Sequence, residues 1–202
     1  MMGIDVSQHN GYIDWGKVKA SGKADFAILR TGFGREHVRQ IDRQFERNYA
    51  ECTRLGIPVG AYHYSYAVSP EDAEKEAEFC LKLLKGKKLQ MPVWYDIEEK
   101  SHVNRGNCDD IASAFCNMLE ASGYFVGVYT FDSFAKTNLS NRTKVRYAMW
   151  IARIGSDPRF SPYGIHQYSW TGKISGIKGD VDMNNCLLNY PAVIVNKHFN
   201  GN

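Results

Sequence analysis

Residues 91–99 read Met91-Pro92-Val93-Trp94-Tyr95-Asp96-Ile97-Glu98-Glu99, an apolar run that ends in carboxylates. Successive side chains of a β-strand alternate between its two faces, so the odd-numbered and even-numbered positions separate. One face would hold Val93, Tyr95 and Ile97 against helices, and the other would hold Trp94, Asp96 and Glu98. An edge strand with solvated acids is the alternative, but the flanking apolar residues favour a buried strand. Buried carboxylates are costly unless they are paired or used, so we expect functional acids inside a barrel.

Short β-rich runs alternate with amphipathic helical stretches along the chain. Strands are expected at Met2–Val6, Asp25–Thr31, Pro58–Tyr66, Met91–Glu98, Tyr124–Thr130, Tyr147–Arg153, Gly164–Trp170 and Ile174–Asp182. Helices are expected at Trp15–Ser21, Asp42–Leu55, Pro70–Leu84, Asp109–Ser122 and Ser133–Leu139. Such alternation is typical of parallel strands with helices outside the sheet. The predicted fold class is α/β, an irregular TIM-like (β/α) barrel with about eight strands and about five helices.

The last third of the chain departs from this alternation. From Tyr147 onward the expected strands are joined by loops, so the C-terminal third should be poor in helices and include some antiparallel pairing. A length of 202 residues and a hydrophobic share of 44% suit one domain. We expect a barrel domain over residues 1–192 and a C-terminal tail over residues 193–202, either a frayed terminus or a trimmed linker.

Composition limits the compartment and the partners. No apolar run approaches the ~18 residues of a membrane span, and the N-terminus lacks a secretory signal, so we expect synthesis in the cytoplasm and no membrane partner. The net charge of +3 comes from dispersed basic residues, which argues against nucleic acid, and we expect a monomer. The five cysteines should be buried free thiols: Cys52, Cys80, Cys108, Cys116 and Cys186.

Two further acids stand near the ends of expected strands. Asp5 follows Gly3-Ile4, and Asp182 lies in the run Gly179-Asp-Val-Asp-Met-Asn184. Alone, each is more often a cap or turn residue, but with Asp96 and Glu98 they would ring one opening of the barrel. Residues i and i+2 of a strand are about 6.5 Å apart, so the pKa values of two such acids separate. A protonated acid beside an anion is the pair that cleavage of a glycosidic bond requires.

Other kinds of active site have weaker support. The candidate metal ligands form neither an HExxH nor an HxH pair: His9, His63, His102 and His166. The chain also lacks a GxSxG elbow, a P-loop and a complete GxGxxG run. We therefore expect no metal and no cofactor.

The ordered motifs resemble the glycoside hydrolase family 25 lysozymes, N-acetylmuramidases of phages and bacteria. The matching motifs lie within residues 3–187: Gly3-Ile-Asp-Val-Ser-Gln-His-Asn-Gly11, Gly60-Ala-Tyr-His-Tyr64, Tyr95-Asp-Ile-Glu98, Trp150-Ile-Ala152, Gln167-Tyr168 and Val181-Asp-Met-Asn184. Each motif is short, but the ordered set is specific. Cys186 departs from the pattern, in which an aromatic residue is usual at this position.

The resemblance implies roles for particular residues. Glu98 would be the catalytic acid, Asp96 the second carboxylate, and Asp5 and Asp182 the other active-site aspartates. A sugar-binding groove would be lined by Tyr62, Tyr64, Trp94, Tyr129, Trp150 and Gln167. Aromatic faces suit this task because they cover the apolar faces of sugar rings at little entropic cost.

The implied reaction is hydrolysis of the β-1,4 bond between N-acetylmuramic acid and N-acetylglucosamine in bacterial peptidoglycan, outside the cell. A chitinase-like N-acetylglucosaminidase is one alternative, although the aspartates usual before the glutamate are replaced by Val93-Trp94-Tyr95. A non-catalytic barrel that binds the cell wall is another. We expect retention of configuration with the substrate's 2-acetamido group as the nucleophile. An inverting route through Asp5 or Asp182 is kept as the alternative.

Overall fold

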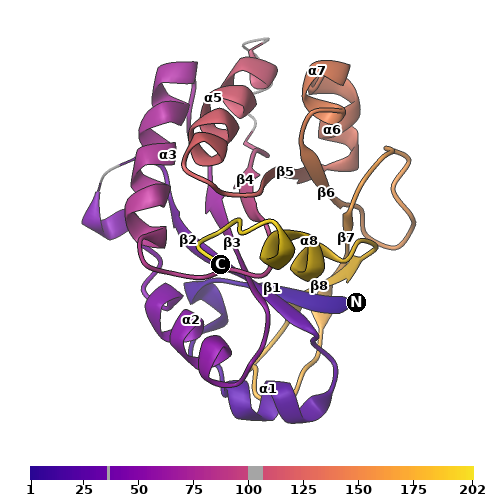
Figure 1. The fold of residues 1–202 in the computed structure, drawn as a ribbon. Coiled ribbons are helices and arrows are strands. Elements are labelled where there is room, and N and C mark those ends of the chain that lie inside the picture. The colour runs from indigo at the N-terminus through magenta and orange to yellow at the C-terminus, as the bar shows by residue number, and fades with distance from the viewer. Residues whose placement is uncertain (36, 100–106) are drawn as a thin grey trace.

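Eight β-strands follow one another around a closed barrel in the order of the sequence (Figure 1). The computed structural model describes residues 1–35, 37–99 and 107–202, and His102 lies outside them. The strands are β1 (Met2–Val6), β2 (Phe26–Phe33), β3 (Val59–Tyr64), β4 (Val93–Asp96), β5 (Val126–Phe131), β6 (Ala148–Ala152), β7 (Ile165–Gly172) and β8 (Val181–Cys186). Strands β1 to β7 pair in parallel, whereas β8 runs antiparallel to both β7 and β1. The predicted barrel and its late antiparallel pairing are confirmed.

The described residues contain seven α-helices, against about five expected. They are α1 (Trp15–Ser21), α2 (Phe45–Arg54), α3 (Pro70–Leu84), α5 (Cys108–Ala121), α6 (Asp132–Asn138), α7 (Asn141–Lys144) and α8 (Tyr190–Asn196). Two 3-10 turns, η1 (Gln8–Asn10) and η2 (Val38–Gln40), add to these. The unexpected helices are α7 and α8, which are too short to show a clear 3.6-residue period. No helix of the described residues is long and apolar enough to cross a membrane.

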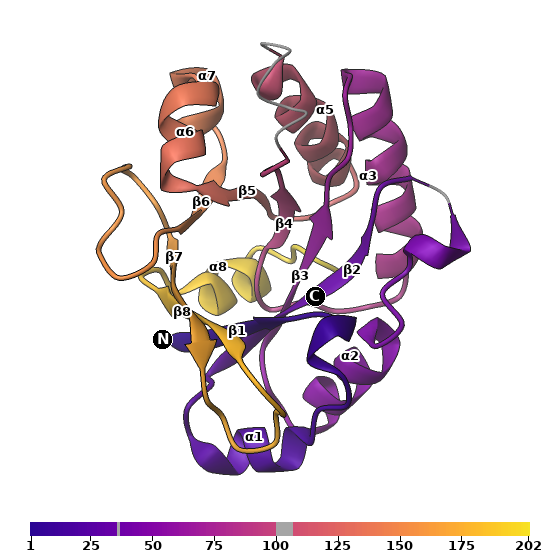
Figure 2. The same cartoon turned by 180° about the vertical axis from the view of Figure 1, so that it is seen from behind.

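Strand β8 begins later than expected. The run Ile174–Asp182 was predicted as the last strand, but residues 174–179 form the turn between β7 and β8. This turn packs on the start of α1, where Asp14 N donates to Gly176 O over 2.8 Å. A side chain at Gly176 would collide with the backbone oxygen of Asp14, so a close backbone contact sets the turn. Figure 2 shows this hairpin beside α1.

The two faces of β4 pack into different layers, as the alternation predicts. Val93, Tyr95 and Ile97 belong to the apolar cluster between barrel and helices, and Tyr95 stacks on Phe115 of α5 with ring centroids 3.9 Å apart. Trp94 belongs to a second cluster inside the barrel. The five cysteines are buried and free, which confirms the expectation for them.

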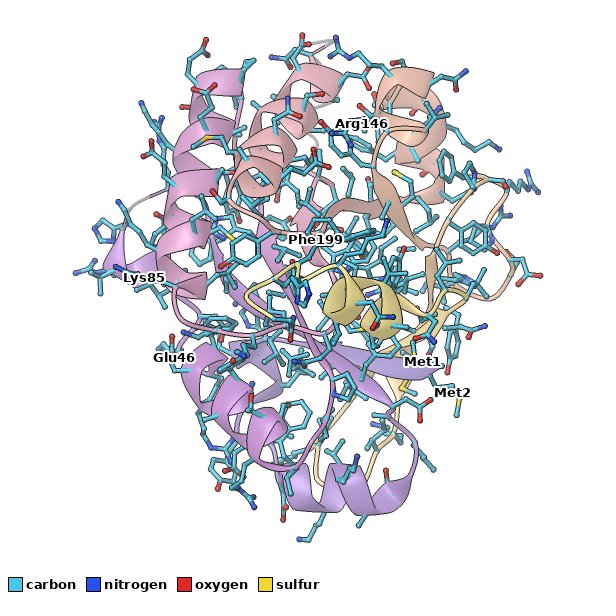
Figure 3. All side chains as sticks on the ribbon, in the orientation of Figure 1. Met1, Met2, Glu46, Lys85, Arg146 and Phe199 are labelled. Carbon is cyan, nitrogen blue, oxygen red and sulfur yellow. The ribbon has the colours of Figure 1, made fainter. Side chains whose placement is uncertain are left out.

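The C-terminal segment packs against the end of the barrel where the parallel strands begin. The expected boundary at residue 192 falls inside α8, and Phe199 contacts Phe125 with ring centroids 5.9 Å apart. Figure 3 labels Phe199 in this segment. Asn200 is buried, accepts hydrogen bonds from Leu89 N and Phe125 N, and donates to Gly123 O and Met91 O. The expectation of a frayed terminus is therefore wrong, because these bonds tie the segment to the residues that precede β4 and β5.

Replacing Asn200 by Ala is expected to lower the free energy of unfolding by about 3 kcal/mol, since Phe125 N and Met91 O would lose their buried partners. The φ of 57° at Asn200 adds to the cost, because alanine adopts this left-handed conformation less readily. Urea unfolding measures the change. The exposed Lys197→Ala is the control and should stay within about 0.5 kcal/mol of the parent. Equal unfolding midpoints for the parent and both variants would contradict the stabilising role assigned to the hydrogen bonds of Asn200.

Candidate active site

A cavity of about 280 Å³ opens at the end of the barrel where the parallel strands finish. Its lining comprises Asp5, Ser7, His9, Asn10, Arg30, Tyr62, Tyr64, Asp96, Glu98, Tyr129, Trp150, Gln167 and Asp182. All four predicted acids are present, with five of the six predicted substrate-binding residues. Asp182 reaches this end from the start of β8 because that strand is antiparallel to its neighbours.

Trp94 is the one predicted groove residue that does not line the cavity. Its indole is fully buried inside the barrel, edge-on to Trp150 at 5.7 Å and to Tyr190 at 6.0 Å between centroids. Gly127 on β5 leaves room for this ring, since a side chain there would collide with it. Trp94 therefore supports the cavity floor through Trp150. The alternation of the sequence predicted that Trp94 points into the barrel but not how deep it lies. Trp94 precedes Asp96 by two residues on the strand and therefore lies deeper inside the barrel.

Asp5 and Asp182 share a hydrogen bond on one side of the cavity. Asp5 Oδ2 also accepts from Gln167 Nε2 over 2.9 Å and from Asn184 Nδ2 over 2.8 Å, so its anionic form is supported. Burial, followed by the charge of Asp5, raises the pKa of Asp182 to about 8. Burial raises the pKa of Asp5 as well, but its hydrogen bonds oppose that rise, so Asp5 rather than Asp182 carries the negative charge of the pair.

Asp96 and Glu98 face the same cavity from β4 and the residues after it. Burial and then the neighbouring Glu98 charge raise the pKa of Asp96 well above its usual range, against the opposing charge of Arg30. Among the described residues, Asp96 Oδ1 is buried without a hydrogen-bond partner. The buried Oδ1 of Asp96 is therefore a hydrogen-bond acceptor that is available to a bound ligand.

Burial is also the main cause that raises the pKa of Glu98, to about 7. The Tyr64 and Tyr129 hydroxyls lower it, whereas the charges of Glu99 and Asp5 raise it. From the sequence, an Asp96 anion is expected to raise the pKa of Glu98. The main causes are instead burial and the charges of Glu99 and Asp5, and, after burial, it is the Glu98 charge that raises the pKa of Asp96. A carboxyl group with a pKa near 7 is half protonated at neutral pH, which suits a general acid.

Arg30 is the main site residue that sequence reasoning missed. Its Nε donates to Asp42 Oδ2 over 2.9 Å, and Asp42 Oδ2 also accepts from Gln8 N over 2.8 Å. Arg30 Nη2 is buried with no partner among the described residues. The available signal was an arginine directly after the apolar run Phe26–Leu29 on the same expected strand, where a buried cation requires a partner or a function.

Aromatic rings form one wall of the cavity. Trp150 contacts Tyr62 and Tyr129 with centroid distances of 6.3 and 4.5 Å, and its Nε1 donates to Asn184 Oδ1 over 2.8 Å. Tyr64 donates to Glu99 Oε1 over 2.6 Å and contacts the half-exposed Tyr66. This wall can cover the apolar face of a sugar ring. In the described part of the chain, no cluster of three or more His, Cys, Asp or Glu residues could hold a metal ion.

A closed α/β barrel with paired acids and an aromatic wall at the carboxyl end of its strands defines a barrel of the glycoside hydrolase class. The chain belongs to glycosyl hydrolases family 25, whose sequence model matches residues 4–177. The matched range contains Asp5, Asp96 and Glu98, and Asp182 follows shortly after it.

Two relatives illustrate the similarity in sequence. The autolytic lysozyme of Clostridium acetobutylicum is 30% identical over 185 residues, which are 91% of this chain and 55% of that protein. Lysozyme M1 of Streptomyces globisporus is 27% identical over 203 residues, covering 91% of this chain and 67% of its own length.

Solved structures show the same fold. The modular autolysin LytC from Streptococcus pneumoniae aligns with a TM-score of 0.81 and 30% identity over 91% of this chain and 46% of its own. The bacterial lysozyme from Streptomyces coelicolor aligns with a TM-score of 0.79 and 25% identity over 98% of both chains. The chain thus spans about half the length of LytC and of the clostridial relative.

Proposed function

We propose that this protein hydrolyses the β-1,4 bond between N-acetylmuramic acid and N-acetylglucosamine in bacterial peptidoglycan. The observation that carries the proposal is the pair of Glu98, with a pKa of about 7, and Asp96, with an unfilled buried acceptor, in one aromatic-walled cavity. Lysozymes and autolysins among the relatives agree with this reaction.

Glu98 acts as the general acid and donates its proton to the oxygen of the leaving N-acetylglucosamine as the glycosidic bond breaks. The carbonyl oxygen of the muramic acid 2-acetamido group attacks the anomeric carbon, which forms a positively charged ring. Water then attacks this carbon and gives a proton to Glu98, and the ring reopens. The two displacements together retain the configuration.

Asp96 orients the acetamido group rather than bonding to the sugar. Its unpartnered Oδ1 can accept the acetamido N–H, which fills the empty acceptor. That hydrogen bond and the developing positive charge both favour the carboxylate, so binding of substrate lowers the pKa of Asp96. The inverting alternative needs a free base, but Asp5 already accepts two amide hydrogen bonds and Asp182 has a pKa of about 8.

Product analysis tests the reaction. Purified cell wall is digested and reduced with borohydride, and the new reducing sugar is identified. Muramicitol is the expected product. Glucosaminitol would instead indicate an N-acetylglucosaminidase, and binding to walls without cleavage would indicate a non-catalytic barrel. Proton NMR of the first-formed anomer tests the mechanism, since an α product from the β bond would contradict the retaining route.

The activity should fall as the pH rises above about 7. The general acid must be protonated, and Glu98 loses its proton as the pH passes its pKa, so kcat/KM should decrease about tenfold per pH unit beyond that point. A pH–rate profile measures this limb. In Tyr64→Phe the limb should move to higher pH, because the Tyr64 hydroxyl lowers the pKa of Glu98. A limb at the same pH in both proteins would exclude Glu98 as its source.

Asp182→Asn should retain most of the activity, with a loss of less than about tenfold. At neutral pH the protonated Asp182 is a neutral donor to Asp5, and an asparagine amide can replace that donor. Asp182→Ala removes the donor and should lose more. Initial rates on cell-wall fragments compare the two variants, and an asparagine variant as slow as the alanine variant would contradict the assigned protonation.

A further inference from the structure

A second cavity, of about 510 Å³, lies beside the catalytic one at the same end of the barrel. Phe131 of β5 and Ala152 of β6 form its apolar floor and are register partners. Tyr129 and Trp150, two residues earlier on the same strands, line the catalytic cavity. Same-face residues of a strand are about 7 Å apart, so the two cavities are neighbours along the barrel mouth.

A chain of contacts joins the two cavities. Phe131 lies edge-on to Trp170 with centroids 6.3 Å apart, and Trp170 Nε1 donates to Gln167 Oε1 over 3.2 Å. Gln167 in turn donates to Asp5 in the catalytic cavity. A polymer bound across the catalytic acids would therefore pass within reach of the second cavity.

The second cavity carries a net positive charge. Its one acid, Asp132, is buried, accepts from Phe160 N over 2.7 Å and pairs with Arg153 Nη1 over 3.1 Å. Lys136 and Arg159 also line the cavity, and neither forms an ion pair with any residue that the structure describes. Both are exposed, so two uncompensated cations face this space.

The catalytic cavity has the opposite character. Four acids line it, and its buried cation Arg30 is already paired with Asp42. Among charged side chains, an anionic group on the substrate would meet only acids and the already paired Arg30 there, whereas Lys136 and Arg159 would attract it. In peptidoglycan, each peptide branches from the lactyl group of muramic acid and carries carboxylates, whereas a polymer of N-acetylglucosamine alone carries none.

We propose that Lys136 and Arg159 bind a carboxylate of the peptide attached to the muramic acid beside the cleaved bond. The inference rests on the proposed function and adds a specificity site to it. Through this site, the enzyme selects glycan that still carries its peptides, and it discriminates against neutral glycans of the same backbone.

Two substrates test the site: an uncrosslinked peptidoglycan oligomer with its peptides, and the same oligomer after an amidase has removed them and the freed lactyl carboxylates have been capped as neutral methylamides. Neither contains wall-linked phosphate polymers, so a phosphate cannot supply the effect. For Lys136→Gln/Arg159→Gln, KM on the peptide-bearing oligomer should rise roughly fivefold, with kcat within about twofold of the parent. On the peptide-free oligomer both constants should stay unchanged.

Two matched variants complete the experiment. Lys23→Gln/Lys75→Gln removes the same charge from exposed positions outside the cavity and should leave both substrates unaffected. Lys136→Arg/Arg159→Lys keeps the charge and should keep the parent KM. Equal KM changes on the two oligomers, or no change on either, would overturn the inference alone. A parent enzyme that cleaves neither oligomer would overturn the proposed function and this inference with it.

Discussion

Replacing Glu98 by Gln is expected to lower kcat by roughly 10²–10⁴-fold, the range typical for loss of a general acid. The amide keeps the size of the side chain but cannot protonate the leaving oxygen at neutral pH. The basic limb of the pH profile should also disappear, since it reports the proton on Glu98. Turnover on uncrosslinked peptidoglycan oligomers measures both effects, and near-normal turnover would exclude Glu98 as the acid.

Glu99→Gln provides the matched control for this prediction. Glu99 is the next residue along the chain and accepts from Tyr64, but it does not line the catalytic cavity. Its substitution should cost less than about fivefold in kcat, an effect of the size of one lost hydrogen bond. Because the charge of Glu99 raises the pKa of Glu98, the basic limb should move to lower pH in this variant.

Asp96→Asn is expected to reduce kcat by about 10²-fold or more, comparable with removal of one group that stabilises transition-state charge. The amide cannot balance the positive charge that develops on the substrate. Stability should change in the other direction, because Asp96 is buried with an unpartnered oxygen and a strongly raised pKa. We expect a melting temperature equal to or above that of the parent, measured by calorimetry beside the kinetics. If the variant retained more than about a tenth of the activity, that result would contradict the role of Asp96 in stabilising the positive charge on the substrate.

The alternation of residues 91–98 allowed a prediction of the strand, its two packing layers and the position of its acids. This worked because the period of a strand is a local property, and each face of β4 meets a uniform environment. The depth at which a strand residue lies inside the barrel, in contrast, is not a local property of the sequence. Trp94 and Asp96 share a face, yet Trp94 is sealed below the cavity while Asp96 faces it.

Contacts between distant parts of the chain account for what the sequence did not indicate. Arg30 and Asp42 are recognisable as partners only once β2 and the residues before α2 are placed together. Likewise, the polar Asn200 suggests an exposed terminus until its four buried hydrogen bonds are known. Polar side chains that act through tertiary contacts leave no periodic pattern in the sequence. Such residues are therefore expected at the surface, although the structure buries them.

The antiparallel entry of β8 between β7 and β1 has a consequence for folding. Asp5 lies on the first strand, yet its partners Gln167 and Asn184 are 162 and 179 residues away along the chain. Contacts of such separation form late, because the entropy of closing the chain must be offset before they contribute stability. A chain still being synthesised lacks both β8 and the network that holds Asp5, so we expect catalytic competence to arise only when the barrel has closed.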